Sequence, residues 1–167
     1  MAEFSTDTRI RPLVTADRET VRQILEASGS FTTEELGIAL ELIDEWIERG
    51  EASGYVTSVI EESSEVRGYI CYGPTPLTDG TFDLYWIAVE STAQGKGYGQ
   101  RLLRHAEGDV RQRGGRLLLI ETSSQESYGS TIRFYERAGY ELVARIPGYY
   151  RPGDDKLVFA KSLADVG

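Results

Sequence analysis

Three glycines alternate with other residues in the segment Gln94 to Gly99, between an apolar stretch and an amphipathic one. Where a strand ends and a helix begins, several backbone N–H groups have no partner within the helix, and the positive end of the helix dipole lies nearby. Glycine removes the Cβ that would keep a phosphate away from the backbone. Because Lys96 and Arg101 add positive charge, the segment predicts an anion-binding site.

Two common phosphate-binding loops do not fit these residues. A Walker loop has Ser or Thr after Gly-Lys, whereas Gly97 follows Lys96 here. A dinucleotide-binding loop has a third glycine three places after the second, and Gln100 stands at that place. The anion is therefore expected to be bound in another way.

A third pattern, Gln/Arg-x-x-Gly-x-Gly/Ala between a strand and a helix, is satisfied by Gln94, Gly97 and Gly99. Downstream, the run Ile132 to Glu141 is similar to the segment Phe-Tyr-Glu-Lys-x-Gly-Phe. In these two motifs and in the order of its elements, the chain resembles the acetyl-CoA-dependent N-acetyltransferases of the GNAT superfamily over about residues 8–163. One departure is Tyr128, which stands where many members carry an asparagine that contacts the cofactor.

The resemblance implies acetyl-CoA as cosubstrate. The amides of the glycine segment would hold its pyrophosphate. The strand before the segment would bind the pantetheine arm and polarise the acetyl oxygen with fixed backbone dipoles. The residues expected to bind the cofactor are Ile87, Ala88, Val89, Gln94, Gly95, Lys96, Gly97, Tyr98 and Gly99.

Acetyl transfer to an amine needs a neutral nitrogen and a proton for the departing thiolate. An alkylamine with a pKa near 10.4 is protonated at neutral pH, so a general base accelerates the reaction by about 10²–10⁴-fold. By position in the family, Asp83 is the expected base and Tyr135 the expected acid. Glu121 is the reserve candidate for the base. Asp83 is also compatible with a solvated residue near the start of a strand, and Glu121 with an exposed carboxylate at the end of one. The Tyr135 ring is also compatible with packing on the sheet.

The acceptor is expected to bind near the segment Pro147 to Asp155, where Tyr149, Tyr150 and Asp154 could attract a cationic amine through ring faces and charge. Glu121 completes the expected substrate-binding residues. The same segment is equally compatible with a proline-braced turn that carries surface tyrosines.

The chain contains one cysteine and one histidine, which cannot form an intrachain disulfide or a Cys/His zinc site. Cys71 lies in an apolar strand and is expected to be a buried, unreactive thiol, and His105 is expected to face solvent. We therefore expect direct attack of the amine in a ternary complex rather than transfer through an acetyl-cysteine, and no metal.

The composition restricts the partners. The 167 residues carry a formal net charge of -9, which disfavours nucleic acid because such binding depends on neutralising phosphates. The longest apolar run, Leu84 to Val89, is six residues long, far below the roughly 20 of a membrane-spanning helix. The sequence predicts one N-acetyltransferase domain over residues 1–167, in the cytoplasm, without a membrane or nucleic-acid partner, and leaves a homodimer open.

Hydrophobic periodicity and turn residues predict an α/β (α+β) fold, with a mixed, mostly antiparallel sheet of about seven strands and four helices. The expected strands are Arg9 to Val14, Gly54 to Ile60, Val66 to Tyr72, Thr81 to Val89, Arg116 to Glu121, Tyr140 to Arg145 and Lys156 to Lys161. The expected helices end near Ala27, Gly50, Gly114 and Gly139. The predicted function is acetyl transfer from acetyl-CoA to a primary amine of a small molecule or a protein. The alternative is an acyl-CoA-binding sensor or interaction module without turnover.

Overall fold

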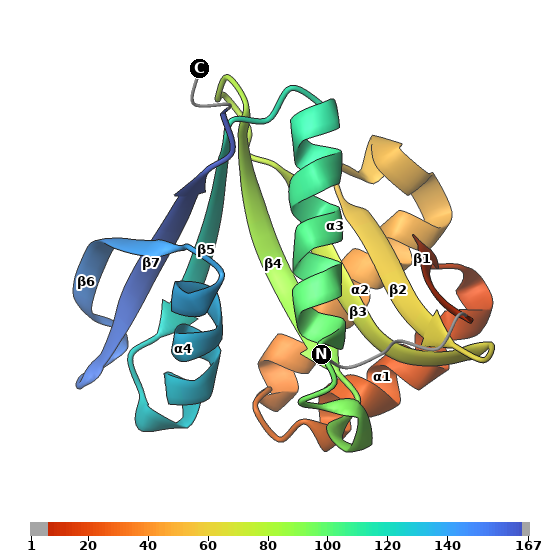
Figure 1. Cartoon of the computed structure of the whole chain (residues 1–167). Helices are drawn as coiled ribbons and strands as arrows, with labels where there is room; N and C mark the ends of the chain where they lie inside the picture. The colour runs from red at the N-terminus through yellow and green to blue at the C-terminus, as the bar shows by residue number, and fades with distance from the viewer. Residues whose placement is uncertain (1–6, 165–167) are drawn as a thin grey trace. The chain divides into compact units, whose positions relative to one another are not determined.

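The computed structural model of the chain describes residues 7–164 (Figure 1). The described residues form two compact units. Unit 1 contains the described residues up to Gly73 together with Trp86–Gly108, and unit 2 contains Pro74–Tyr85 together with the described residues from Asp109 onward. Strand β4 (Thr81–Val89) and helix α3 (Tyr98–Gln112) contribute residues to both.

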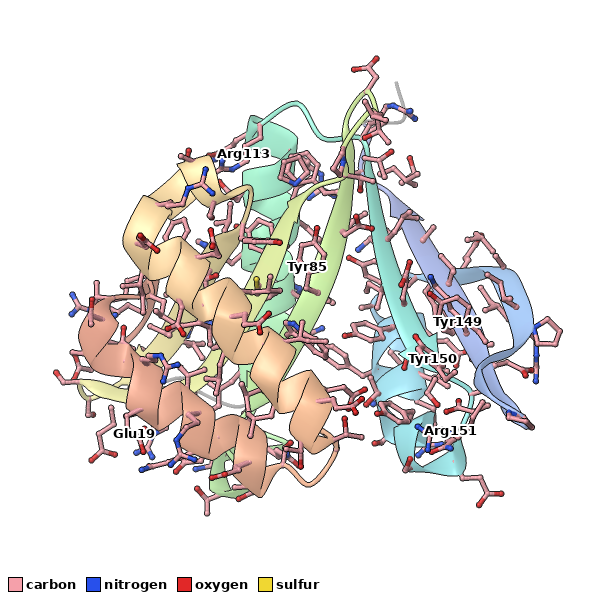
Figure 2. The ribbon with its side chains drawn as sticks, turned by 180° about the vertical axis from the view of Figure 1, so that it is seen from behind. Glu19, Tyr85, Arg113, Tyr149, Tyr150 and Arg151 are labelled. Atoms are coloured by element: carbon pink, nitrogen blue, oxygen red, sulfur yellow. The ribbon has the colours of Figure 1, made fainter. Side chains whose placement is uncertain are left out.

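Unit 1 is built on an antiparallel meander. Strand β2 (Val56–Glu62) pairs with β1 (Thr8–Pro12) on one side and with β3 (Glu65–Pro74) on the other. Helices α1 (Arg18–Ala27) and α2 (Thr33–Arg49) lie on one face of these strands and α3 on the other, as Figures 1 and 2 show from opposite sides. Unit 1 therefore has three layers, with the sheet in the middle.

Helices α1 and α2 end where the sequence predicts. The side chain of Thr32 accepts a hydrogen bond from the Glu35 backbone, and the Glu35 carboxylate accepts one from the Thr32 backbone, so α2 starts with a capping box. Gly50 ends it with a positive φ of 55°. The core of unit 1 is apolar and includes Val21, Leu25, Ile43, Val59, Ile60, Tyr69, Leu102 and Leu103.

Unit 2 combines a parallel and an antiparallel pairing. Residues Thr81 to Leu84 of β4 pair in parallel with β5 (Leu117–Ser123), and β5 pairs antiparallel with β7 (Asp154–Ser162). Strand β6 (Glu141–Arg151) forms the edge beside β7, and helix α4 (Gly129–Arg137) covers one face of these strands (Figure 1). Parallel neighbours need a crossover connection, which here is made through α3.

The strands of unit 2 have one covered and one open face. Lys161 of β7 donates a hydrogen bond to the Ala138 carbonyl at the end of α4, so its side of the sheet is the covered face. Leu118, which pairs with Lys161, is buried on that side. Because side chains alternate along a strand and paired residues share a face, the opposite side carries a second set of side chains. We call this side the open face, and it carries Asp83, Leu119, Glu121, Lys156 and Val158.

The described residues confirm the predicted mixed sheet of seven strands, in the order β1-β2-β3-β4-β5-β7-β6, and the four α-helices. The prediction that the chain leaves the sheet between Arg145 and Lys156 is wrong. Strand β6 continues to Arg151, and β7 begins at Asp154. A register shift between Ile146 and Arg151 absorbs the residues that do not pair. The single domain remains a prediction. No helix within residues 7–164 is long and apolar enough to span a membrane.

Candidate active site

The glycine segment joins β4 to α3 in unit 1. Gly95 and Gly97 have φ angles of +79° and +85°, which residues with a Cβ rarely adopt. A Cβ placed on Gly95 would meet nothing within 4 Å, so the backbone there is open. The Arg101 N–H donates to the Gly97 carbonyl at 3.1 Å as α3 begins. The N–H groups ahead of this bond have no acceptor within the helix, and this geometry suits an anion.

The residues around this segment contribute in different ways. Lys96 is exposed, so its ammonium can reach a bound anion. Tyr98 is buried, and burial together with a hydrogen bond to Glu62 raises the pKa of its phenol. Tyr98 can therefore offer an anion only its backbone N–H. The Gln94 side chain donates to the Val89 carbonyl at 3.5 Å, which connects the segment to the end of β4.

The end of β4 lies close to β3 within unit 1. The carbonyl oxygen of Ala88 is 2.8 Å from the position that a Cβ on Gly68 would occupy, so only glycine allows this approach. Ala88 is buried, whereas Ile87 and Val89 are half-buried. Our sequence analysis missed Gly68, although a glycine inside an apolar strand is the usual sign of a close backbone contact.

Both candidate bases lie on the open face of unit 2. Asp83 pairs with Leu119, and Glu121 follows Leu119 by two residues on the same side of β5. Asp83 is half-buried and accepts a hydrogen bond from the Thr75 hydroxyl at 2.7 Å, which orients its carboxylate. Thr75 was not singled out from sequence, because it lies just beyond the end of β3 and has no periodic signal. The structure brings Asp83 and Glu121 to the same face of unit 2.

The candidate acid, Tyr135, lies in α4 on the covered side of unit 2. The centre of its ring is 5.3 Å from the centre of the Phe134 ring and 5.9 Å from that of the Tyr140 ring. The residue is only 4% exposed. Burial raises the pKa of this phenol well above its usual value, because the charged form would lose its hydration. Tyr135 therefore keeps its proton at neutral pH and beyond the usual pKa of a tyrosine.

The expected acceptor residues form a cluster on unit 2. Tyr149 and Tyr150 are 53% and 44% exposed, and their rings meet edge to face at 4.9 Å (Figure 2). Lys156 lies with its Nζ 4.5 Å from the centre of the Tyr149 ring and 3.0 Å from Glu121 Oε2. The sequence analysis did not assign a role to Lys156. The sequence pattern does not show that Lys156 and Glu121 lie on the same face of the sheet.

Asp154 and Asp155 do not join this exposed cluster. Asp154 is buried and accepts a hydrogen bond from the Ser123 hydroxyl, which corrects the expectation that it attracts the acceptor. The Asp155 carboxylate accepts bonds from the Gly148 N–H at 2.8 Å and from the Arg145 guanidinium at 2.6 Å. These bonds hold the irregular part of β6 that carries Tyr149 and Tyr150.

The remaining candidates behave as expected. Burial raises the pKa of the Cys71 thiol to about 12, an effect that a hydrogen bond with Thr57 only partly offsets. A thiol with that pKa supplies almost no thiolate at neutral pH. His105 is exposed on α3. Tyr128, the residue that departs from the family pattern, lies half-buried at the N-terminus of α4.

The sequence model described as the acetyltransferase (GNAT) family matches residues 19–140, which include the glycine segment and Tyr135. The chain belongs to this family. A GNAT-family acetyltransferase structure from Desulfovibrio desulfuricans is similar at 46% identity with a TM-score of 0.91, covering 94% of this chain and 99% of that one. Over the aligned region, the two proteins therefore share both sequence and fold.

Two further comparisons are informative. The L-methionine sulfoximine/L-methionine sulfone acetyltransferase of Salmonella typhimurium is 30% identical over 61% of this chain and 60% of its own length. The match thus spans about three fifths of that curated relative. A Salmonella typhimurium protein whose structure was solved with acetyl-CoA has the same fold at a TM-score of 0.74, with 22% identity over 96% of each chain.

Proposed function

We propose that this protein transfers an acetyl group from acetyl-CoA to a primary amine of a small molecule. The observation that carries the proposal is the glycine segment between β4 and α3, where two positive-φ glycines open the backbone beside a helix N-terminus. The segment would hold the pyrophosphate of coenzyme A, together with the exposed ammonium of Lys96. The relative that was solved with acetyl-CoA supports this choice of ligand.

The backbone of Ile87 to Val89 would bind the pantetheine arm and polarise the thioester. Peptide dipoles that are already in place stabilise a developing oxyanion without reorganising. The contact of the Ala88 carbonyl with Gly68 supports this role, because it restricts the position of the strand.

Asp83, held by Thr75, would take a proton from the amine directly or through one water, and Glu121 is the alternative base. Tyr135 would give its proton to the departing thiolate. The two proposed groups are separate residues, Asp83 on the open face and Tyr135 in α4 on the covered side of unit 2. The unreactive thiol of Cys71 favours direct attack over a covalent intermediate.

The acceptor class is proposed from the Tyr149 and Tyr150 cluster and from the relative that is named for small amino-acid derivatives. The exposed rings of Tyr149 and Tyr150 offer apolar surface to a small acceptor. A protein amine remains the alternative acceptor, and the oligomeric state and the cytoplasmic location stay predictions.

Two measurements test the proposed function. Calorimetry with acetyl-CoA should detect saturable binding, and a screen of amines, amino acids, polyamines and lysine peptides should detect release of free coenzyme A. Absence of binding would overturn the assignment of the glycine segment. Binding without release for any acceptor would instead favour the sensor.

A further inference from the structure

Lys156 occupies the most enclosed position of the acceptor cluster. Its side chain is 14% exposed, although the side chain of its partner Glu121 is 52% exposed. The ammonium lies 4.5 Å from the centre of the Tyr149 ring and 3.0 Å from a Glu121 oxygen. The protein's own cation thus lies against both an aromatic face and a carboxylate.

An aromatic face next to a carboxylate is also what would bind a cationic group of a substrate. Tyr149 and Glu121 form such a pair, but both already contact Lys156. A second ammonium that arrived at these groups would meet a positive charge at short range. The sequence expectation that the cluster attracts cations is therefore opposed by a residue of the chain itself.

We propose that Lys156 determines acceptor specificity by filling the cation position of the Tyr149 and Glu121 cluster, so that acceptors with a second positive charge are disfavoured. The inference rests on the proposed function, because it concerns the acceptor of acetyl transfer. It narrows the acceptor class to amines whose other end is neutral or anionic.

The electrostatics of the cluster keep this lysine charged. Partial burial acts to lower the pKa of Lys156, but the hydrogen bond and charge of Glu121 outweigh it, so the pKa lies above its usual value. The opposing cation is therefore present throughout the neutral pH range.

Lys161 provides a matched comparison within the same strand. Its ammonium lies 5.5 Å from the centre of the Tyr140 ring, but it donates a hydrogen bond to the Ala138 carbonyl on the covered face. A substitution at Lys161 removes the same charge from β7 without opening the Tyr149 and Glu121 cluster. Effects of net charge alone can thus be separated from effects of the cluster.

The test compares Lys156→Met and Lys161→Met with the unaltered protein on straight-chain diamines of two to six carbons and on the monoamines of equal length. We expect Lys156→Met to raise the ratio of kcat/KM for diamine over monoamine by about fivefold or more for at least one length. Lys161→Met should leave the ratio within twofold. An unchanged ratio in a folded Lys156→Met protein would overturn the inference.

Two further variants keep the test decisive. Lys156→Arg retains the charge, so it should keep the low ratio of kcat/KM for diamine over monoamine. The double variant of Lys156→Met with Tyr149→Leu should lose the increase in this ratio, because it lacks the aromatic ring. Diamine binding, followed by tyrosine fluorescence, should become tighter in Lys156→Met even when no acetyl transfer is measured. If the unaltered protein releases no coenzyme A with any amine, the proposed function fails. If it releases coenzyme A but neither ratio nor binding responds, only the role of Lys156 fails.

Discussion

The glycine segment of unit 1 and the open face of unit 2 represent two ways to build a binding site. The segment presents backbone N–H groups, and its positive-φ glycines at Gly95 and Gly97 make that backbone accessible. The open face presents side chains from three strands, among them Asp83, Glu121 and Lys156. The first site depends on residues adjacent in sequence, whereas the second depends on strand register. Variants should therefore affect cofactor binding and acceptor chemistry separately.

The largest effect should come from Asp83, the proposed base on the open face. Asp83→Asn keeps the size of the side chain but removes the proton acceptor, so we expect kcat to fall by about a hundredfold at neutral pH. The loss should shrink as the pH rises toward the pKa of the amine, because the acceptor then loses its proton to solvent. Coenzyme A release measured from pH 7 to 10 checks this, with Glu121→Gln alongside. Losses below twofold in both variants would remove both carboxylates from the role of base.

The next largest effect should come from Tyr135, the proposed acid. Tyr135→Phe removes only the hydroxyl, so kcat should fall by at least about tenfold while the Kd of acetyl-CoA changes little. Because burial raises the pKa of Tyr135, its acid form persists above the usual tyrosine pKa. We therefore expect that kcat does not decrease as the pH rises to the usual pKa of a tyrosine. Tyr140→Phe, a buried ring in contact with Tyr135, is the matched control, and equal losses in both variants would argue for a packing effect.

A smaller and purely local effect should appear in the glycine segment. Gly95→Ala introduces a Cβ at a φ of +79°, which should shift the backbone that we propose holds the pyrophosphate. We expect the Kd of acetyl-CoA to rise about fivefold, measured by calorimetry. Gly114→Ala has nearly the same φ, +80°, and the same open surroundings at the end of α3. Gly114→Ala should cause similar backbone strain without changing the Kd of acetyl-CoA. Equal changes of this Kd in the two variants would contradict the assignment of the glycine segment as the cofactor site.

The smallest effect should concern the part of β6 that carries the tyrosines. The hydrogen bond from the Gly148 N–H, followed by that from Arg145, holds the pKa of Asp155 below its usual range. The carboxylate therefore stays ionised at neutral pH and is protonated only under acidic conditions. Asp155→Asn should raise the acceptor KM about threefold without altering the Kd of acetyl-CoA. Asp109→Asn, which breaks a helical ion pair with Arg113, should change neither.

Local signals predicted the elements better than the connection between β6 and β7. The glycines that follow α2 and α3 are short-range signals, and both helices end close to the predicted positions. Pro147 and Gly148 are typical of a loop, yet β6 continues through them. The bonds that hold this irregular strand come from Asp155, beyond the turn. A turn-forming composition therefore did not reveal that the strand continues.

The sequence by itself determined the family and the glycine segment, because a backbone site needs only a strand, a few glycines and a helix start in succession. The family model spans the same residues. Only the tertiary structure decided that Lys156 lies against Glu121 and Tyr149, and that Asp154 is buried. Side-chain partners on a sheet depend on register, and a shift of one residue moves a side chain to the other face. That register is set by long-range pairing, which the order of the residues does not display.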